Sequence, residues 1–357
     1  MSDPEKNAEY IAAAVRCPLP VHKDRVILLG HGSGGRLTAG LVRDIFLPAL
    51  SNPIIDRLND SAELNVGESR LVFTTDSFVV SPLRFPGGDI GSLAVNGTIN
   101  DLAVVGAQPI ALSAAFILEE GFPISQLAWV AQSIGEASQQ SGVPIVAADT
   151  KVVERGKADG MFITTSGIGV VKEDLQLGPE RAEPGDAVLV SGPIGDHGIA
   201  VMSAREGLEF ESTVITDCAP LHGLVQRMLV YNSSIRCMRD PTRGGVATIL
   251  NELAKSSAVE IIIDEHSVPV RGAVRAACEI MGLDPLYVAC EGRLIAIVDD
   301  ARADQVLAAM RGHPLGNRAC RIGSVTKGSA PRVLLRTAFG TTRLLDLLAG
   351  EQLPRIC

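Results

Sequence analysis

The segment Leu71-Val72-Phe73-Thr74-Thr75-Asp76-Ser77 organises the first half of this 357-residue chain. Its apolar and β-branched residues predict a strand over residues 71–75, and this strand ends at the carboxylate of Asp76. Apolar spacing predicts further helices and strands downstream, at residues 90–105, 124–141, 145–147 and 161–171. The first half of the chain is therefore expected to combine both kinds of element.

Upstream of this segment, a glycine cluster separates two predicted elements. Residues 25–29 are predicted to form a strand, and residues 37–47 a helix that Pro48 stops. The cluster is Gly30-His31-Gly32-Ser33-Gly34-Gly35. Unpaired N–H groups at a helix start favour an anion, so the cluster, with His31, Gly32, Ser33, Gly34 and Gly35, is a candidate phosphate cradle. A dinucleotide-binding turn and a turn that serves only packing stay open as alternatives.

The second half repeats the alternation of strands and helices. The predicted strands are at 187–190, 260–263 and 294–298, and the predicted helices begin at 199 or span 246–254, 274–281 and 303–310. A stretch rich in Gly, Pro and Glu near residues 177–185 indicates a hinge. The predicted organisation is a leader at 1–24, a first domain at 25–176, a second domain at 177–348 and a tail at 349–357.

Composition excludes several classes of function. The net charge of −9 and an aromatic content of 4% argue against binding to duplex or single-stranded nucleic acid. The longest apolar run, residues 110–118, is too short to cross a bilayer, and we expect a cytoplasmic protein without a membrane segment. Seven scattered cysteines without a C-x-x-C pair argue against a disulfide framework or a zinc ribbon.

Acidic residues stand at the ends of several predicted elements. They are Asp60, Asp76, Asp101 and Asp149. Carboxylates are rarely buried without partners, and Mg²⁺ takes hard oxygen ligands together with nucleotide phosphates. The four residues together therefore predict a site for magnesium and ATP, in which Lys151 pairs with a phosphate or a transferring group. For any single one of them, capping of a helix or turn is the alternative.

Two further glycine turns open helices in the second half. They span residues 192–198 and 240–245, and both are expected to face one cleft. Arg243 in the second turn is suited to phosphate because its guanidinium binds oxyanions with two parallel bonds. His197 in the first turn is a candidate ligand or acid, with a hydrogen-bonded structural histidine as the alternative.

The chain ends in Leu353-Pro354-Arg355-Ile356-Cys357. Because Pro354 cannot continue a helix, the last residues are expected to leave the fold as an extended, mobile arm. A thiol on such an arm can act as a movable chemical handle, which would make the tail itself a substrate. By position alone, a frayed terminus is the alternative.

Taken in order, these motifs resemble a known superfamily. They resemble the ATP-using aminoimidazole ribonucleotide synthetase (PurM-like) superfamily at residues 71–77, 85–91, 100–103, 149–153 and 240–246. With residues 31–35 and the terminal Pro-Arg-Ile-Cys, they resemble within it the HypE family of hydrogenase maturation proteins. The resemblance covers residues 25–357 and leaves the leader without a function.

The resemblance implies an α+β fold of two domains, with an N-terminal ATP-binding domain that dimerises through its sheet and a C-terminal α/β domain. It also implies a reaction. The terminal thiolate receives a carbamoyl group from a carbamoyltransferase, HypF, and ATP drives dehydration of this S-carboxamide to a thiocyanate. The cyano group then passes to iron on a scaffold of HypC and HypD. The alternatives are a PurM-like synthetase acting on a diffusible small molecule, a nucleotide-sensing or metal-carrier scaffold without turnover, and a nicotinamide oxidoreductase.

The resemblance also assigns roles to residues. Asp60, Asp76, Asp101 and Asp149 would hold magnesium and ATP, Asn100 and Arg243 would contact the nucleotide, and residues 31–35 would hold its phosphates. Cys357 would carry the substrate group, Lys151 would act on the activated amide, Glu291 would be the base, and His197 would be a further candidate in catalysis. Two departures from the family pattern are Ala148, in place of Gly at an expected turn, and Cys290, in place of Asn.

Overall fold

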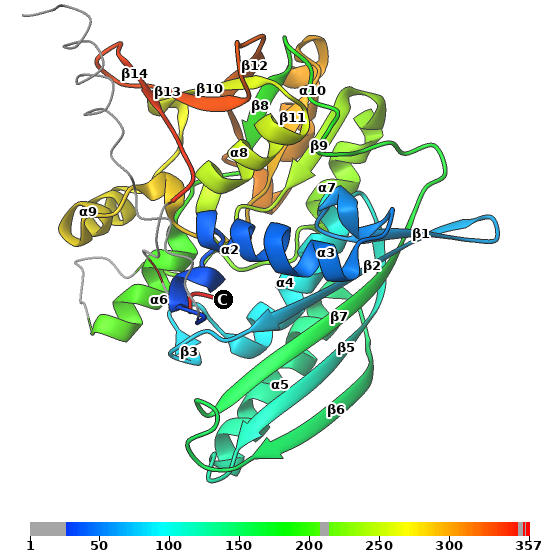
Figure 1. The fold of residues 1–357 in the computed structure, drawn as a ribbon, viewed down its shortest axis with the longest axis vertical. Coiled ribbons are helices and arrows are strands. Elements are labelled where there is room, and N and C mark those ends of the chain that lie inside the picture. Colours follow the sequence, from blue (N-terminus) through cyan, green and yellow to red (C-terminus); the bar gives the residue numbers. More distant parts are fainter. Residues whose placement is uncertain (1–25, 208–213, 349–352, 354) are drawn as a thin grey trace, which may run out of the picture.

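The computed structural model describes residues 26–207, 214–348, 353 and 355–357, which form two sheets with helices packed on them (Figure 1). The first sheet has the strand order β1-β2-β7-β5-β6, and only β5 and β6 pair in parallel. Its strands are β1 (Ala62–Val66), β2 (Ser69–Phe78), β5 (Gln108–Glu119), β6 (Ile145–Val153) and β7 (Met161–Val171). Helices α4 (Ile90–Val104) and α5 (Ile124–Ser141) cover one face of this sheet.

The second sheet has the order β14-β13-β10-β12-β8-β11-β9. Its strands are β8 (Ala187–Val190), β9 (Ile235–Arg239), β10 (Glu260–Asp264), β11 (Ile295–Val298), β12 (Cys320–Thr326), β13 (Arg332–Arg336) and β14 (Thr342–Leu344). The helices of this half are α6 (Asp196–Glu206), α7 (His222–Met228), α8 (Gly245–Ser256), α9 (Gly272–Met281) and α10 (Ala303–Arg311). A two-stranded ribbon, β3 (Arg84–Phe85) and β4 (Gly88–Asp89), precedes α4.

Helix α4 joins the two halves. Its sequence is apolar on nearly every side, as expected of a helix buried all round. One side packs on β2 and β7, while Ala103 and Val104 belong to the apolar core that contains α7, β8 and β11. The helix has only 15 residues, and no helix in the described parts of the chain is long and apolar enough to cross a membrane.

Most predicted elements are present, including the strand over residues 71–75 within β2 and the helices that became α4 and α5. The predicted strand at 25–29 is wrong. Residues 26–28 have no regular structure, and Leu29–Gly32 form a 3₁₀ helix. The apolar side chains of this segment are exposed, Val26 and Leu29 by 67% and 70%, because no neighbouring strand pairs with them.

The predicted stop at Pro48 is also wrong. Helix α2 (Arg36–Leu41) continues through a π turn (Val42–Phe46) into α3 (Leu47–Leu50), so Pro48 lies inside the helix. In the π turn, the N–H of Leu47 donates to the carbonyl of Val42. The wider turn shifts the bonding register just before a residue that has no N–H, which lets the helix pass the proline.

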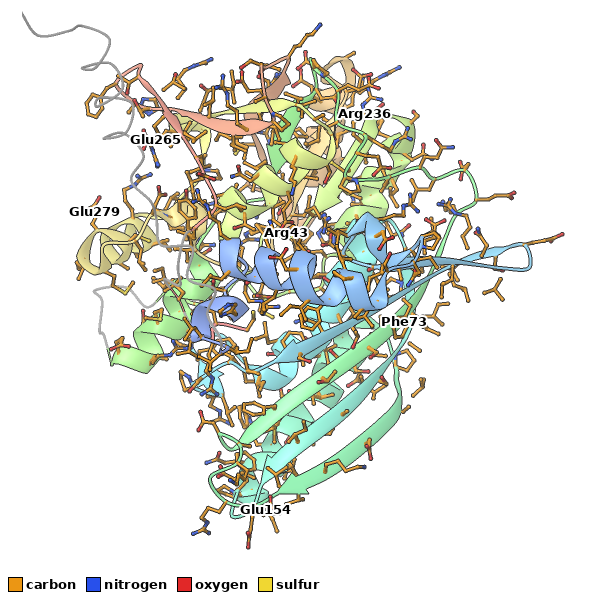
Figure 2. All side chains as sticks on the ribbon, viewed as in Figure 1. Arg43, Phe73, Glu154, Arg236, Glu265 and Glu279 are labelled. Carbon is orange, nitrogen blue, oxygen red and sulfur yellow. The ribbon has the colours of Figure 1, made fainter. Side chains whose placement is uncertain are left out.

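No helix of the described chain covers the second face of the first sheet. Side chains on this face include Phe73 of β2 and its cross-strand neighbour Ile168 of β7 (Figure 2). These two and Val170 and Ile117 are 37–42% exposed. A sheet face with this much apolar surface in the open is typical of an interface.

Candidate active site

Four carboxylates from four elements surround the junction of the two halves. Asp76 lies near the end of β2, and Asp101 lies in the last turn of α4. Asp240 follows β9, and Glu291 precedes β11. The two halves of the fold contribute two carboxylates each, so this cluster forms only when the domains are packed together.

These carboxylates disfavour one another's charge. Burial raises the pKa of Asp76 and raises that of Asp101 well above its usual value, with the charges of Asp240 and Asp76 adding to the effect on Asp101. Burial raises the pKa of Asp240 to about 6. Arg243 opposes these shifts at Asp76 and Asp101. Arg239 lowers the pKa of Asp240 but is already paired with Asp60. The carboxylates among the described residues therefore outnumber the guanidinium groups beside them, which favours a cation.

The donor set suits a cation that arrives with a ligand. Within the described residues, no three acidic, histidine or cysteine side chains converge closely enough to hold a metal ion alone. Magnesium in nucleotide sites is held by one or two carboxylates and completes its shell with phosphates and water. Two of the three carboxylates of Asp76, Asp101 and Asp240 would meet that requirement.

Asp60, also predicted as a metal ligand, has a different partner in the structure. It forms an ion pair with Arg239 of β9, and both side chains are largely buried. Removing two charges from water costs free energy. This pairing and the hydrogen bond from Arg239 to the carbonyl of Leu58 offset that cost. Asp60 Oδ2 has no hydrogen-bond partner. The pair connects the two halves beside the carboxylate cluster.

The glycine cluster lies against Arg243. Arg243 Nη1 donates to the carbonyl of Gly32 at 3.1 Å. Gly34 has φ +78°, and a Cβ there would lie 2.8 Å from the carbonyl oxygen of Arg243. Glycine is therefore required at position 34 both by the left-handed backbone and by the close approach. The loop and the turn at Arg243, predicted from distant parts of the sequence, form one wall of the site.

Glu291 is buried, and its carboxylate lacks a partner. The side chain is 1% exposed, and Oε1 forms no hydrogen bond. Burial, and then the charges of Asp240, Asp76 and Asp217, raise its pKa well above the usual value, while Arg243 lowers it. The backbone N–H of Glu291 donates to Asp217 Oδ1 at 3.0 Å, which fixes the position of the residue.

Asn100, predicted to contact the nucleotide, is fully buried. Its amide nitrogen donates to the carbonyls of Ala219 and Glu291, and its Oδ1 accepts from the N–H of Leu221 at 2.8 Å. Both amide hydrogens are thus used on backbone groups. In this structure Asn100 positions the loop of Glu291.

The end of the chain is docked in this site, in contrast to the expectation that it leaves the fold. The N–H of Val79 donates to the main-chain oxygen of Cys357 at 3.1 Å, and the N–H of Ser81 donates to the carbonyl of Arg355 at 3.2 Å. Ile356 is 2% exposed and belongs to the core of the first domain. The C-terminus lies in the interior, beside α2 and α6 (Figure 1). Arg355 has φ +51°, so the tail is bent there and not extended.

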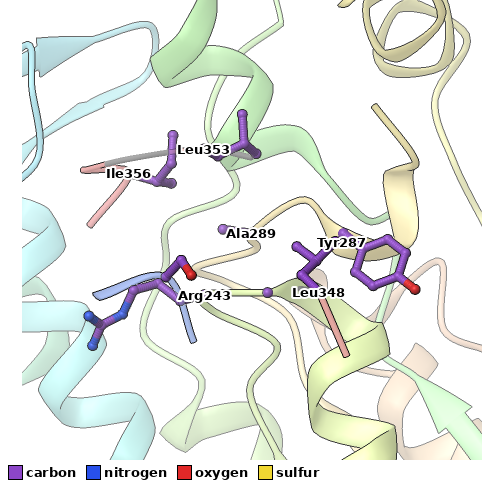
Figure 3. A pocket seen from close by; sticks show the side chains of 8 residues that line it. Arg243, Tyr287, Ala289, Leu348, Leu353 and Ile356 are labelled. Atoms are coloured by element: carbon purple, nitrogen blue, oxygen red, sulfur yellow. The ribbon is translucent and has the colours of Figure 1, made fainter. Parts of the chain in front are cut away.

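The thiol of Cys357 lies among the charged groups of the site. Burial raises its pKa, Arg243 lowers it, and Glu291, Asp76 and Asp240 add to the increase. The docked thiol is therefore neutral at physiological pH. Next to it a pocket is lined by Ile356 and Leu353 of the tail on one side and by Arg243, Leu348 and Tyr287 on the other (Figure 3).

His197 contacts the tail directly. Its Nε2 lies 3.0 Å from the carbonyl of Ile356, and its Nδ1 lies 2.8 Å from Thr216 Oγ1. A carbonyl only accepts, so Nε2 carries the proton and Nδ1 accepts from the threonine hydroxyl. Burial lowers the pKa of this fully buried ring. A neutral ring with both nitrogens occupied holds the tail in place.

Asp149 and Lys151 lie apart from the other predicted residues. Both are exposed on β6 and form an ion pair, with Lys151 Nζ 2.7 Å from Asp149 Oδ2. The hydrogen bond from Lys151 lowers the pKa of Asp149. Strands β7 and β5 separate β6 from β2, a distance of about 14 Å at the usual strand spacing. Asp149 is in register with Ala115, on the uncovered face, whereas Asp76 is in register with the buried Thr165 on the other.

Both departures from the family pattern are harmless to local geometry. Ala148 lies within β6 opposite Ala114, so the turn expected there is wrong and no glycine is needed. Cys290 is fully buried, its sulfur accepts from the N–H of Gly195 at 3.2 Å, and burial raises its pKa well above the usual value. It is an inert neutral thiol.

Sequence reasoning missed several residues that build the site. Asp240 was part of a recognised motif, and its position directly after a strand was the available signal. Arg205 and Asp159, which contact the tail, had no signal, because they are common charged residues on a helix and in a loop. Only the folded chain places them beside its own C-terminus.

Comparison with known proteins identifies two family domains. Residues 58–171 match AIR synthase related protein, N-terminal domain, and residues 183–336 match AIR synthase related protein, C-terminal domain. The chain is 54% identical over 327 residues to carbamoyl dehydratase HypE of Azotobacter vinelandii, covering 92% of this chain and 96% of that protein. Against carbamoyl dehydratase HypE of Escherichia coli (strain K12) it is 43% identical, with coverage of 93% and 99%.

Solved structures agree with these matches. A HypE-HypF complex contains a chain that is 46% identical with a TM-score of 0.82, covering 86% of this chain and 99% of that one. HypE in complex with ATP is 48% identical with a TM-score of 0.78, covering 93% and 100%. A ThiL complexed with AMPPCP and TMP, at 19% identity and a TM-score of 0.67, shares the fold. The predicted PurM-like α+β fold of two domains is confirmed.

Proposed function

This chain belongs to the HypE family of carbamoyl dehydratases, and we propose from this premise that Cys357 carries the group on which its reaction takes place. The protein is an ATP-dependent enzyme of hydrogenase maturation. The observation that supports Cys357 is the docked tail, which brings the terminal thiol beside Arg243 and the buried Glu291. Dehydration of an S-carbamoyl group at this position yields a thiocyanate.

ATP binds at the carboxylate cluster with Mg²⁺. Two of the carboxylates of Asp76, Asp101 and Asp240 would hold the metal together with the phosphates, which would relieve the mutual repulsion of these acids. Residues 31–35 and Arg243 face the phosphates. The metal, when bound, supplies positive charge to the transferring phosphoryl group.

The reaction requires ATP because an amide oxygen is a poor leaving group until it is phosphorylated. The carbamoyl oxygen attacks the γ-phosphorus of ATP, ADP leaves, and the nitrogen gives up one proton. The C–O bond then breaks, inorganic phosphate leaves, and loss of the second N–H proton completes the C≡N bond. Glu291 accepts a proton in this sequence, and burial, which raises the pKa of its carboxylate, strengthens it as a base, while Arg243 opposes that shift.

The thiol is loaded at a different position from the one observed. A thiolate is the nucleophile for carbamoyl transfer, and the docked site suppresses it by raising the pKa of Cys357. An S-carbamoyl group is neutral and does not meet this penalty. The tail therefore leaves its docked position to receive its carbamoyl group from the carbamoyltransferase HypF. It returns for dehydration and later presents the cyano group to iron on HypC and HypD.

The active form is a homodimer in which the uncovered faces of two first sheets pack together. The apolar residues on that face support this arrangement. Asp149 and Lys151 lie on the same face, and strands β7 and β5 separate them from Asp76 of their own chain. In a dimer they act from the second copy, with Lys151 stabilising the activated amide. The cytoplasm is the proposed location.

The test is a pair of cysteine variants. Cys357→Ser keeps the fold and ATP binding but cannot form thiocyanate, because an alcohol is a far weaker nucleophile than a thiolate at neutral pH. The matched control, Cys290→Ser, retains thiocyanate formation. ATP hydrolysis that is unaffected by Cys357→Ser would instead favour a synthetase acting on a diffusible molecule.

A further inference from the structure

Residues 355–357 lie in a groove that contacts a main-chain oxygen of each of them. Ser81 N–H and Arg205 Nη2 donate to the carbonyl of Arg355, the latter at 2.7 Å. His197 Nε2 donates to the carbonyl of Ile356, and Val79 N–H donates to the main-chain oxygen of Cys357. All three acceptors are satisfied by the body of the protein. Main-chain pairing along an exposed strand end is a known mode of peptide recognition.

Two side chains of the tail add selectivity. Ile356 is buried in the core of the first domain, which requires an apolar residue one position before the thiol. The Arg355 guanidinium donates from Nε to the carbonyl of Val79 at 2.8 Å, forms an ion pair with Asp159 and lies over the ring of Phe162. Arg355 thus closes the groove from the side of the β6–β7 connection.

We propose that Val79–Ser81, His197, Arg205 and Asp159 form a binding site for a C-terminal peptide ending in Arg-Ile-Cys, and that Arg355 is the latch that holds this peptide in the dehydration position. His197 and Arg205 are positioning residues: they fix the main chain of the tail and transfer no proton. The inference rests on the proposed function of Cys357 as carrier. It adds the residues that decide whether the carrier is docked.

The contacts predict a graded series of effects on the rate. Arg355→Ala loses the bond to Val79 and the ion pair, and misplacement of the reacting group lowers the single-turnover dehydration rate on the order of 10- to 100-fold. Asp159→Ala loses only an exposed ion pair, worth a change of at most about fivefold. Arg336→Ala is the matched control, because it removes an exposed ion pair with Asp264 on the outer strands and leaves the rate unchanged.

His197 separates positioning from acid–base chemistry. His197→Gln retains an N–H donor for the Ile356 carbonyl, so the dehydration rate stays within several-fold of the native one. His197→Ala loses the donor and slows the reaction on the order of tenfold or more. Equal inactivity of both variants would show that the imidazole transfers a proton and would overturn the assignment.

The experiment uses the full-length, S-carbamoylated protein with excess ATP and follows the C-terminal peptide by mass. In parallel, unmodified protein is treated with maleimide, and labelling of each cysteine is located by peptide mass. The proposal expects Arg355→Ala to label Cys357 at least about tenfold faster, with Cys290 still unlabelled, because the latch holds the tail and not the core.

Two outcomes would overturn the proposal. One is native dehydration and native labelling of Cys357 in Arg355→Ala. The other is faster labelling of Cys357 and Cys290 alike, which indicates general unfolding. If the native protein itself forms no thiocyanate on Cys357, the proposed function fails and not the groove alone.

Discussion

At the scale of single residues, the site is built from carboxylates placed where they weaken the apo protein. Asp101 lies in the last turn of α4, where the helix dipole disfavours a negative charge, and burial disfavours it further. Asp89, at the first turn of the same helix, accepts from the N–H groups of Gly91 and Ser92 and stabilises the helix. Asp89 is a cap, whereas Asp101 is the residue that we propose as a ligand for a cation.

This contrast gives the first prediction. Asp101→Asn weakens Mg-dependent ATP binding but raises the stability of the nucleotide-free protein by on the order of 1–3 kcal/mol at pH 8. In the folded protein, the pKa of Asp101 lies above its usual value of 3.8, so protonation of this carboxylate favours the native state. This contribution to the free energy of unfolding is lost as the pH rises through the pKa of the folded protein. The increase in stability of Asp101→Asn over the native protein therefore disappears near pH 4.

Asp89→Asn serves as the comparison, because it weakens a cap and is expected to cost about 1 kcal/mol. Thermal unfolding at pH 4 and pH 8 and calorimetry with Mg–ATP measure these effects. Unaltered ATP affinity together with lost stability in Asp101→Asn would return Asp101 to the capping account.

At the scale of elements, the glycine cluster and the turn at Arg243 form a wall that depends on close backbone contact. Gly34→Ala places a methyl group against the Arg243 carbonyl and forces a left-handed backbone on alanine. We expect ATP affinity to fall at least tenfold, with a loss of stability on the order of 1–2 kcal/mol.

Gly40→Ala is the matched control, since a Cβ at position 40 in α2 meets nothing within 4 Å. It should stabilise the helix by up to about 1 kcal/mol and leave ATP affinity unchanged. Isothermal titration with Mg–ATP distinguishes the two variants, and equal affinities would remove the glycine cluster from the phosphate site.

The helices and strands also show which parts of the fold can be predicted from the sequence. The apolar pattern located α5 and the strand around Phe73, and the length of the apolar run located α4, because local burial determines both signals. It missed β1 and β5, and it read the exposed apolar residues 26–28 as a strand, since apolar composition does not reveal whether a pairing partner exists. Tertiary context decides that.

The same limit applies to the site. Asp76 and Asp101 were predicted to belong together, and β2 and α4 bring them to one place. Asp149 and Lys151 were assigned to the same site, yet the pleat of β6 turns them to the opposite face. A pattern along the chain identifies which residues carry chemistry, but the face and the subunit from which they act follow from strand order and register.

At the scale of the whole molecule, the proposed active form contains two copies of the chain. A chain with Lys151→Ala and a chain with Cys357→Ser are each expected to be inactive in dehydration. In a mixed dimer, the carbamoylated tail of the first chain meets Lys151 of the second. Random mixing therefore restores about one quarter of the native rate, since half of the dimers are mixed and each has one complete site.

Single-turnover assays on the mixture measure this recovery. The control is a second mixture, in which the Glu291→Gln chain replaces the Lys151→Ala chain. Glu291 acts beside the Cys357 of its own chain, so that mixture stays inactive. No recovery in the Lys151 mixture would place Lys151 outside the partner's site.

The most direct test of the central claim follows an oxygen atom. Protein carrying a carbamoyl group labelled with heavy oxygen on Cys357 is mixed with Mg–ATP for one turnover, and the C-terminal peptide and the inorganic phosphate are analysed by mass. The account predicts that the peptide loses one water equivalent at Cys357, that the label appears in phosphate, and that neither change occurs in Glu291→Gln. ATP hydrolysis with an unaltered peptide, or with the label in water and not in phosphate, would contradict it.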